Sequence, residues 1–413
     1  MQMWVYIVRR AFLLIPIILG VMTITFALTS TLPVQQRFIA AHGTPPIRAS
    51  WEYNQYLLPG QGSCPPAPAN NKSCPNPVYS HLLSQLGLNK PIPVQWGLYM
   101  EKSLTFQWGI VGNDSTAAQT ISIIKGQQVT SVLTWFLPYT IELAMLSLAI
   151  ILMIAIPFGN LAAVNRNRPI DQGARVLSFS GYALAPFLLS SLLLVAVVIL
   201  VGASSGYHTV TPWCGGSGEA TFFEFYGSWP QLPCFANQAY PPWLTSGIIS
   251  HPTGFPTVDA LIHHQYWLAV DSIVRMILPA LVIAFGSIAV LLRFVRNSML
   301  EVMNLDFVRT ARAEGVPEKT VVKRHAGRNS LNVTITVLGL TFAFFIGGFP
   351  VIEDVFHLNG VGLMLALAVQ TSSGPIDFGL VFGSTLLFTY IVVIANIIVD
   401  VLYAYLDPRV RLG

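Results

Sequence analysis

Residues 378–399 read FGLVFGSTLLFTYIVVIANIIV, a run of 22 residues without a charged side chain between Asp377 and Asp400. About 20 apolar residues in an α-helix cross the roughly 30 Å hydrocarbon core of a membrane. Five further runs of this kind occur, at 11–32, 138–164 (interrupted only by Glu142), 176–203, 276–292 and 331–352. The sequence therefore predicts an all-α polytopic membrane protein with six transmembrane helices.

The composition excludes a soluble enzyme of this length. Of the 413 residues, 53% are hydrophobic and only 10% are charged, and the mean hydropathy is +0.61. Soluble domains carry about 25% charged residues, and disordered chains are poor in apolar residues. A further uncharged run, 225–258, is too rich in Pro, Gly, Ser and Asn to be a span, because its backbone groups would be unsatisfied in lipid.

The distribution of Lys and Arg predicts the orientation. One side holds 15 of the 22 basic residues, and an even number of spans puts both termini on that side, which is therefore cytoplasmic. This places the chain in the plasma membrane as a multi-pass protein, and the asymmetry accounts for the net charge of +4 without a nucleic-acid partner.

The same reading divides the chain into nine parts. These are 1–32 (N-terminus and first span), 33–137 (extracytoplasmic), 138–203 (spans two and three with a short basic loop), 204–270 (extracytoplasmic, rich in Cys and aromatic residues), 271–293 (span four), 294–330 (cytoplasmic loop), 331–352 (span five), 353–377 (extracytoplasmic) and 378–413 (span six and C-terminus).

All four cysteines lie in the two long extracytoplasmic segments, where disulfides are chemically reasonable. Four cysteines allow three pairings, and we predict the two local pairs, Cys64–Cys74 and Cys214–Cys234, with free thiols as the alternative. No C-x-x-C or C-x-x-H spacing indicates a metal site. Asn71 and Asn113 begin N-x-[ST] sequons and are possible glycosylation sites. The aromatic residues of the second segment fit either a docking or sugar-binding surface or the small core of a disulfide-linked subdomain.

Motifs for catalysis are absent from the sequence. It contains no G-x-x-x-x-G-K-[ST] phosphate loop, no H-E-x-x-H and no G-x-S-x-G. Glu142 is the only ionisable residue within a predicted span, and it lies one turn from the outer end, where an interfacial acid that reaches water is the favoured interpretation. Ion-coupled transport therefore has weak support. We therefore expect a chain that is not an enzyme and binds no cofactor itself.

The cytoplasmic segment 294–330 is more informative. Asp306 can cap a short helix, Gly315 suits the left-handed position just past its end, and Pro317 fits the first turn of a second helix. The apolar side of the first helix would consist of Leu305, Phe307, Val308 and Ala311. This pattern predicts a rigid helix–turn–helix lying on the cytoplasmic face of the membrane.

This segment resembles the EAA loop of permeases in ATP-binding-cassette (ABC) importers. The resemblance rests on Arg309-Thr-Ala-Arg-Ala-Glu-Gly and Arg324-His-Ala-Gly-Arg-Asn, and it is to the first-permease (B-type) branch of the oligopeptide/dipeptide permease family. It continues over most of the chain, through Tyr6-Ile-Val-Arg-Arg, Leu86-Gly-Leu-Asn-Lys-Pro-Ile-Pro-Val-Gln, Pro157-Phe-Gly-Asn-Leu-Ala-Ala, Arg293-Phe-Val-Arg-Asn-Ser-Met-Leu-Glu-Val, Gly347-Gly-Phe-Pro-Val-Ile-Glu-Asp-Val-Phe and the highly specific Val399-Asp-Val-Leu-Tyr-Ala-Tyr-Leu-Asp-Pro-Arg-Val-Arg.

The resemblance implies a permease with the type I ABC importer fold. It also implies partners: a homologous second permease, two cytoplasmic ATPases that use ATP and Mg²⁺, and an extracytoplasmic substrate-binding protein. The cargo would be di- or oligopeptides or, as in some relatives, oligosaccharides. The residues that would couple to the ATPases are Asp306, Phe307, Arg309, Thr310, Ala311, Gly315 and His325.

The sequence departs from the family pattern in three places. Val333 stands where the family has a proline, the usual Arg-Asp pair is not recognisable around 372–375, and segments 34–85 and 204–265 are longer than typical. A secondary, ion-coupled transporter is the alternative, but it would show more buried charge and repeat-related broken helices. A membrane-embedded hydrolase would need a nucleophile–base or metal constellation that the sequence lacks.

Overall fold

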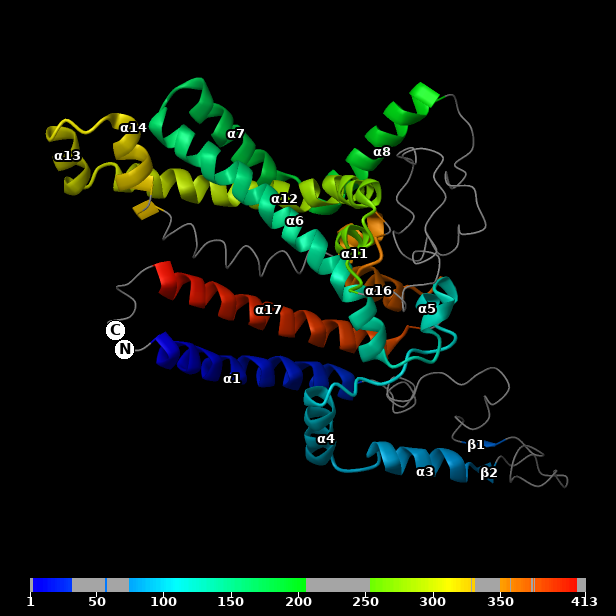
Figure 1. Cartoon of the computed structure of the whole chain (residues 1–413). Helices are drawn as coiled ribbons and strands as arrows, with labels where there is room; N and C mark the ends of the chain where they lie inside the picture. Colours follow the sequence, from blue (N-terminus) through cyan, green and yellow to red (C-terminus); the bar gives the residue numbers. More distant parts are fainter. Residues whose placement is uncertain are drawn as a thin grey trace. The chain divides into compact units, whose positions relative to one another are not determined.

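The computed structural model of the chain describes residues 3–31, 56–57, 74–205, 253–327, 329–330, 350–356, 358–372, 374 and 376–406. Nearly all of the described elements are helices (Figure 1). They are α1 (Met3–Ser30), β1 (Tyr56–Leu57), β2 (Cys74–Pro75), α3 (Pro77–Leu86), α4 (Ile92–Leu104), α5 (Thr116–Thr120), η2 (Ser122–Ile124), α6 (Val129–Val164), α7 (Pro169–Ala183), α8 (Pro186–Ser205), α11 (Pro256–Ile262), α12 (Tyr266–Val302), α13 (Asp306–Ala313), α14 (Glu318–Thr320), η4 (Val321–Ala326), α16 (Val361–Val369) and α17 (Phe378–Leu406).

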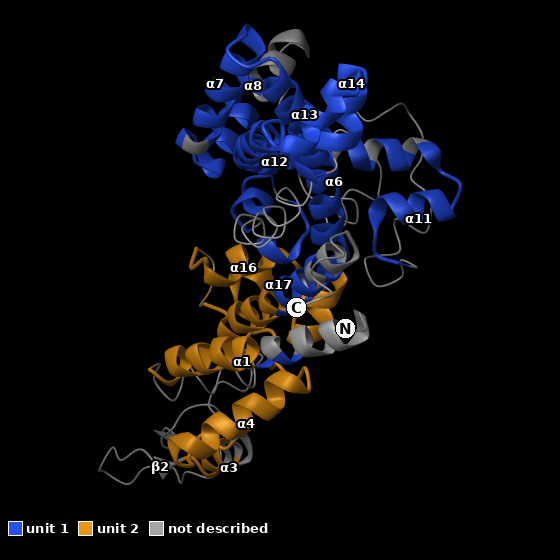
Figure 2. Cartoon of the chain, turned by 90° about the vertical axis from the view of Figure 1, so that its left-hand side faces the viewer, with its two compact units in different colours: residues 1–15, 136–363, 390–413 blue, residues 16–135, 364–389 orange. Residues whose placement is uncertain are grey.

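The chain forms two compact units, each assembled from separate stretches of sequence (Figure 2). Unit 1 comprises Met1–Ile15, Phe136–Leu363 and Tyr390–Gly413, and unit 2 comprises Pro16–Trp135 and Met364–Thr389. The two-residue antiparallel pair of β1 and β2 belongs to unit 2. Together with an isolated antiparallel bridge between Ile110 and Gln128, it is the departure from an all-α fold within the described residues.

Three helices of the described part are long and apolar enough to cross a membrane: Val129–Val164, Leu268–Val302 and Phe378–Val399. A fourth span results if the bent pair Pro169–Gly181 and Pro186–Ala196 crosses as one, and Ile15–Ser30 is a shorter apolar helix. Most of the fifth predicted span, residues 331–349, lies outside the described residues. A multi-pass, mostly helical membrane protein is therefore confirmed, whereas the number six stays a prediction.

The third predicted span is not one straight helix. Residues 176–203 are divided between α7 and α8, which meet at an angle of 102°. The break falls at Leu184 and Ala185, just before Pro186. Proline disfavours helical conformation in the residue before it and fits the first turn of a new helix. The prediction of one continuous helix over 176–203 is therefore wrong, and a crossing of the membrane by the bent pair stays a prediction.

The second and fourth predicted spans are shorter than the helices that contain them. The fourth, 276–292, lies inside the 37-residue helix α12, which continues past Arg293 and Arg296 to Val302. The second, 138–164, begins nine residues late, because α6 starts at Val129. Glu142 therefore lies well inside α6 instead of in its first turn. Arg293 therefore ends the uncharged run but does not end the helix.

Two glycines allow close packing around α12 in unit 1. A Cβ added at Gly159 of α6 would lie 2.7 Å from Cγ1 of Val295, and one at Gly181 of α7 would collide with Ala289. Both neighbours belong to α12, which also contacts α8 and α11. Small residues let helix backbones approach closely in membranes. Helices α6, α7 and α12 are thereby held as one packed group.

Buried carboxylates fix the shorter elements. In unit 1, the fully buried Glu353 accepts hydrogen bonds from Thr140 Oγ1 (2.9 Å) and from the backbone N–H groups of Gly362 (2.6 Å) and Leu363 (3.1 Å), so it caps α16. In unit 2, Asp377 accepts from the N–H groups of Gly112 (2.7 Å) and Leu380 (3.0 Å) at the start of α17. Each carboxylate satisfies helix N–H groups that have no intrahelical partner.

Candidate functional site

The segment that follows α12 is a helix–turn–helix, as the sequence predicts. α13 ends at a Schellman motif: the N–H of Val316 donates to the carbonyl of Ala311 (3.1 Å), and the N–H of Gly315 donates to the carbonyl of Arg312 (3.1 Å). Gly315 has φ +79°, the left-handed conformation expected there. A Cβ added at Gly315 would meet nothing within 4 Å. The turn is therefore defined by its backbone and open on its outer side.

Two details of this segment differ from the prediction. Asp306 is the first helical residue instead of the N-cap, which is Leu305 and makes no side-chain capping bond. Pro317 stands at the N-cap of α14 instead of inside its first turn. The acid still lies in the first turn of α13, where a negative charge is favourable. Such shifts of one residue are typical of helix ends.

The helix–turn–helix is attached to unit 1 by a small apolar core. The core residues come from α6, α12, α13 and η4, and they are Ala163, Met299, Val302, Val308, Ala311, Val321 and Ala326. Val308, Val321 and Met299 have no exposed surface. Complete burial of a side chain such as valine stabilises by roughly 1.5–3 kcal/mol. α13 and η4 are therefore fixed to the ends of α6 and α12.

Of the four residues predicted to form the apolar side of α13, two are buried and two are exposed. Val308 and Ala311, three residues apart, face the core, but Leu305 and Phe307 are 46% and 39% exposed. Leu305 precedes the helix, and Phe307 is turned by about 100° from Val308. The two exposed apolar side chains lie beside Asp306, which is 97% exposed, and Arg309, which is 70% exposed. The outer surface of α13 is thus apolar and charged together.

An ion pair closes the turn between α13 and α14. Arg312 donates to both carboxylate oxygens of Glu318, from Nε (3.1 Å) and from an Nη (2.6 Å). The hydrogen bonds from Arg312 hold the pKa of the Glu318 carboxyl below its ordinary value, and the same bonds raise the pKa of the Arg312 guanidinium. Both side chains are largely exposed, so the pair orients the turn but stabilises it little.

The remaining residues carried over from the EAA resemblance lie in this segment. Thr310 is exposed, and its hydroxyl donates to the carbonyl of Asp306 (3.1 Å). His325 is half-buried in η4, a turn of π-helix, a rare form that is frequently found at functional sites. The basic residues Lys319, Lys323 and Arg324 are exposed. Ala311 is the residue of the Arg309-Thr-Ala-Arg motif that is buried in the apolar core under α13.

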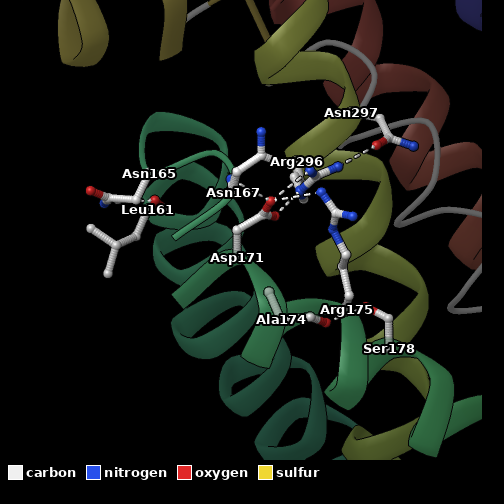
Figure 3. Close-up of polar contacts among 9 residues, drawn as sticks. All are labelled: Leu161, Asn165, Asn167, Asp171, Ala174, Arg175, Ser178, Arg296 and Asn297. Atoms are coloured by element: carbon white, nitrogen blue, oxygen red, sulfur yellow. Dashed lines mark hydrogen bonds and ion pairs between the residues drawn. The ribbon is translucent and has the colours of Figure 1, made fainter. Parts of the chain in front are cut away.

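A second feature, which the sequence reasoning missed, lies next to this core. Asp171 of α7 has no exposed surface, and Figure 3 shows its carboxylate between two arginines. Arg296 of α12 donates from Nε to Oδ1 and from an Nη to Oδ2 (3.0 Å), and Arg175 donates to Oδ2 (2.9 Å). The backbone N–H of Asn167 also donates to Oδ2 (3.0 Å). We call this group the Asp171 cluster.

The Asp171 cluster joins α7 to α12 by a two-pronged bond between guanidinium and carboxylate. Such bonds are shorter and stronger than neutral hydrogen bonds. The sequence contains one local signal, an Asp and an Arg at spacing i, i+4 in a short basic loop. The main partner, Arg296, is 125 residues away in the chain, so only the fold identifies it.

The remaining predicted sites are not tested. Cys64, Cys214, Cys234 and Asn71 lie outside the described residues, and of Cys74 only the backbone in β2 is described. Asn113 is half-buried. Where the structure describes the chain, no three His, Cys, Asp or Glu residues are grouped as a metal site would require. Both disulfides and glycosylation stay predictions.

Comparison with known proteins gives the family. Residues 155–412 match the family model of the binding-protein-dependent transport system inner membrane component. The chain is 31% identical over 336 residues to the probable D,D-dipeptide transport system permease protein DdpB of Escherichia coli K12, covering 81% of this chain and 85% of that protein. It is 28% identical over 410 residues to the dipeptide transport system permease protein DppB of the same organism, covering 98% of each chain.

A putative peptide transport system permease protein of Brucella melitensis is 30% identical over 410 residues, covering 99% of each chain. Both the family model and these relatives extend over the helix–turn–helix and the Asp171 cluster. The chain belongs to the binding-protein-dependent transport system inner membrane components, as an ABC permease of the oligopeptide/dipeptide permease family.

Proposed function

We propose that this chain forms half of the translocation pathway of an ATP-driven importer of di- and oligopeptides, and that α13 is the element that contacts an ATPase. One observation carries the proposal: α13 is fixed from behind by Val308 and Ala311, while Leu305, Asp306, Phe307 and Arg309 project outward. A helix with a rigid base and an apolar, charged outer surface suits docking into a groove of a protein partner.

Movement at α13 would reach the spans through α12. The apolar core joins α13 to Met299 and Val302 at the end of α12, and α12 is a single helix of 37 residues. The Asp171 cluster then joins α12 to α7. A force on α13 would therefore shift α6, α7 and α12 together, because packed interfaces move as units between discrete arrangements.

The other subunits follow from the proposal. ATP and Mg²⁺ would be held by two separate ATPase subunits, since this family consists of transport permeases and not of enzymes. A second permease and an extracytoplasmic binding protein would complete the complex. Both termini and the α13 segment would be cytoplasmic, as the distribution of Lys and Arg predicts. The relatives' names favour peptides over oligosaccharides as cargo.

The decisive experiment replaces Gly315. At φ +79° any side chain costs roughly 1 kcal/mol of turn stability, but nothing lies within 4 Å of an added Cβ, so Gly315→Trp should fold and insert. The indole would project where an ATPase must approach. In liposomes containing the whole complex, we expect ATP-dependent peptide uptake and its stimulation by loaded binding protein to fall about tenfold or more, equivalent to about 1.4 kcal/mol of lost binding.

The matched control is Lys319→Ala, also exposed and four residues away, which should change uptake less than about twofold, as expected for one surface charge. Normal coupling in Gly315→Trp would show that α13 is not the contact. Peptide uptake by this chain without any ATPase would contradict the importer proposal and favour a secondary transporter.

A further inference from the structure

Unit 2 contains a half-open cavity of about 530 Å³. It lies between the C-terminal end of α1, helix α4 with the segment that follows it, and the N-terminal end of α17. Its walls are mainly aromatic and aliphatic, formed by Phe26, Tyr99, Phe106, Trp108, Phe382 and Leu386. Small-molecule sites are typically apolar concavities of about 300–1,000 Å³ with a few polar groups.

Hydrogen bonds to the backbone fix the walls of this cavity. Trp108 Nε1 donates to the carbonyl of Ser103 (3.1 Å), and Gln95 Nε2 donates to the carbonyls of Leu88 (3.0 Å) and Lys90 (2.6 Å). Thr130 Oγ1 donates to the carbonyl of Phe106 (2.6 Å). These polar groups serve the protein itself, so they are not available to a ligand.

Three lining side chains keep their polar groups available. Among the described residues, the Lys102 ammonium and the side-chain amides of Gln107 and Gln128 have no hydrogen-bond or ion-pair partner. Lys102 is half-buried. The cavity therefore offers one cation and two amides against an aromatic wall.

The backbone conformation of Phe106 is a second observation, separate from the shape of the cavity, that points to a ligand site. Its φ is +58°, a left-handed conformation that is an outlier for a bulky side chain. Its ring is 53% exposed and lies 5.6 Å from the ring of Trp108, centroid to centroid. Residues held in rare conformations concentrate at ligand sites, where the surrounding structure enforces them. Here the strained backbone keeps an apolar ring at the cavity wall.

We propose that this cavity binds the C-terminal residues of a short peptide during its passage, an inference that rests on the proposed function. Lys102 would pair with the terminal carboxylate, Gln107 and Gln128 would bind backbone amides, and the Phe106–Trp108 pair would contact an apolar C-terminal side chain. A phospholipid could use the cation, but its acyl chains need no amide partners. Most of the length of two acyl chains would also remain outside a cavity of this size.

The test measures peptide binding to the whole complex in phosphatidylcholine nanodiscs, without binding protein or ATP. The probes are the tripeptide Ala-Ala-Phe with a free carboxylate and the same peptide as its C-terminal amide. Lys102→Gln should weaken binding of the free acid about tenfold or more and leave the amide unchanged, because one charge-assisted bond is lost. The control Lys125→Gln, an exposed lysine outside the cavity, should change neither.

A second variant keeps the proposal testable if Lys102→Gln is misfolded. Phe106→Ala should weaken Ala-Ala-Phe several-fold and leave Ala-Ala-Ala unchanged, because only the first peptide presents a ring to the wall. Equal affinities in wild type and Lys102→Gln would overturn the proposal. So would a large loss of peptide binding in phosphatidylglycerol nanodiscs, since that would identify the anionic lipid as the occupant.

The outcome is separable from that of the proposed function. If the wild-type complex imports peptide with ATP while Lys102→Gln binds it unchanged, the cavity proposal alone is wrong. If the wild-type complex shows no ATP-dependent uptake, the importer proposal is wrong, and the cavity proposal falls with it.

Discussion

At the scale of single residues, the buried carboxylate of Asp171 illustrates how a charge is stabilised inside the protein. Its carboxylate has no exposed surface and accepts hydrogen bonds from Arg296, Arg175 and the backbone of Asn167. The charge is stable in this environment only because it is paired, since an unpaired buried charge is very costly. The two arginines differ: Arg296 is 14% exposed and Arg175 is 50% exposed.

This difference gives a prediction. Asp171→Asn keeps the shape of the side chain and removes its charge, leaving Arg296 uncompensated, so we expect a loss of about 3 kcal/mol in the free energy of unfolding. Arg175→Gln acts on the same carboxylate from the exposed side and should cost less than about 1 kcal/mol. Thermal unfolding of the purified complex would compare them. Equal losses would mean that Asp171 and Arg296 do not form the dominant pair.

Residue-level prediction succeeded where the signal is local. Gly315 could be identified from the sequence because a helix end, a left-handed glycine and a proline follow one another within a few residues. The surroundings of Asp171, Glu353 and Lys102 could not be predicted, because they consist of residues that only the fold brings together. The sequence alone does not tell which residues far apart in the chain become neighbours in space.

At the scale of elements, apolar runs located the long apolar helices that the structure describes but not the ends of these helices. α12 extends beyond its uncharged core because Arg293 and Arg296 are good helix formers, and α7 ends early because Pro186 follows. The four residues predicted to form the apolar side of α13 do not share one environment: Val308 and Ala311 are buried, whereas Leu305 and Phe307 are exposed. Exposed apolar residues of this kind are expected at the docking surface that we propose for α13.

The core under α13 can be tested with a matched pair of substitutions. Val308→Ala removes two methyl groups from a fully buried position and should destabilise the attachment of α13 by about 2 kcal/mol. Leu305→Ala removes a larger side chain from an exposed position and should cost less than about 1 kcal/mol. Hydrogen exchange of the α13 amides in the purified complex should accelerate in the first variant only. Faster exchange in both would mean that Leu305 also belongs to the core.

The Arg312–Glu318 pair predicts a pH dependence. Its hydrogen bonds lower the folded-state pKa of Glu318 below the ordinary 4.5, so its contribution is complete above pH 4.5 and is lost as the pH falls through the lower folded value. The stability difference between wild type and Glu318→Gln should be small, under about 1 kcal/mol, and constant from about pH 8 to pH 5.5. It should shrink below pH 4.5. A difference that instead grows on acidification would contradict the pairing.

At the scale of the whole molecule, the two predicted disulfides remain to be measured. Local pairing of Cys64 with Cys74 and of Cys214 with Cys234 closes short loops and should contribute on the order of 3 kcal/mol each. Peptide mapping by mass spectrometry without reduction would identify the bonds. Crossed pairing, or four free thiols, would contradict this prediction.

The orientation of the molecule follows from one end of unit 1. The apolar core joins Ala163 at the end of α6 to Met299 and Val302 at the end of α12, so the α6–α7 loop and the α13 segment lie at the same end. This end carries Arg166 and Arg168 together with the basic residues that follow α12. By the positive-inside rule we expect this end to be cytoplasmic, and we expect the segment around Lys125, which precedes α6 in the chain, to be extracytoplasmic.

Cysteine labelling in intact cells tests this orientation directly. In a chain whose four cysteines are replaced by serine, Lys125→Cys should react with a membrane-impermeant maleimide, whereas Lys319→Cys should react only after the cells are permeabilised. Both positions are exposed, so a difference in labelling reports the side of the membrane and not burial. The reverse pattern would put α13 outside, where no ATP is available, and coupling through α13 would then be impossible. Labelling of both positions in intact cells would mean that the chain does not keep one orientation.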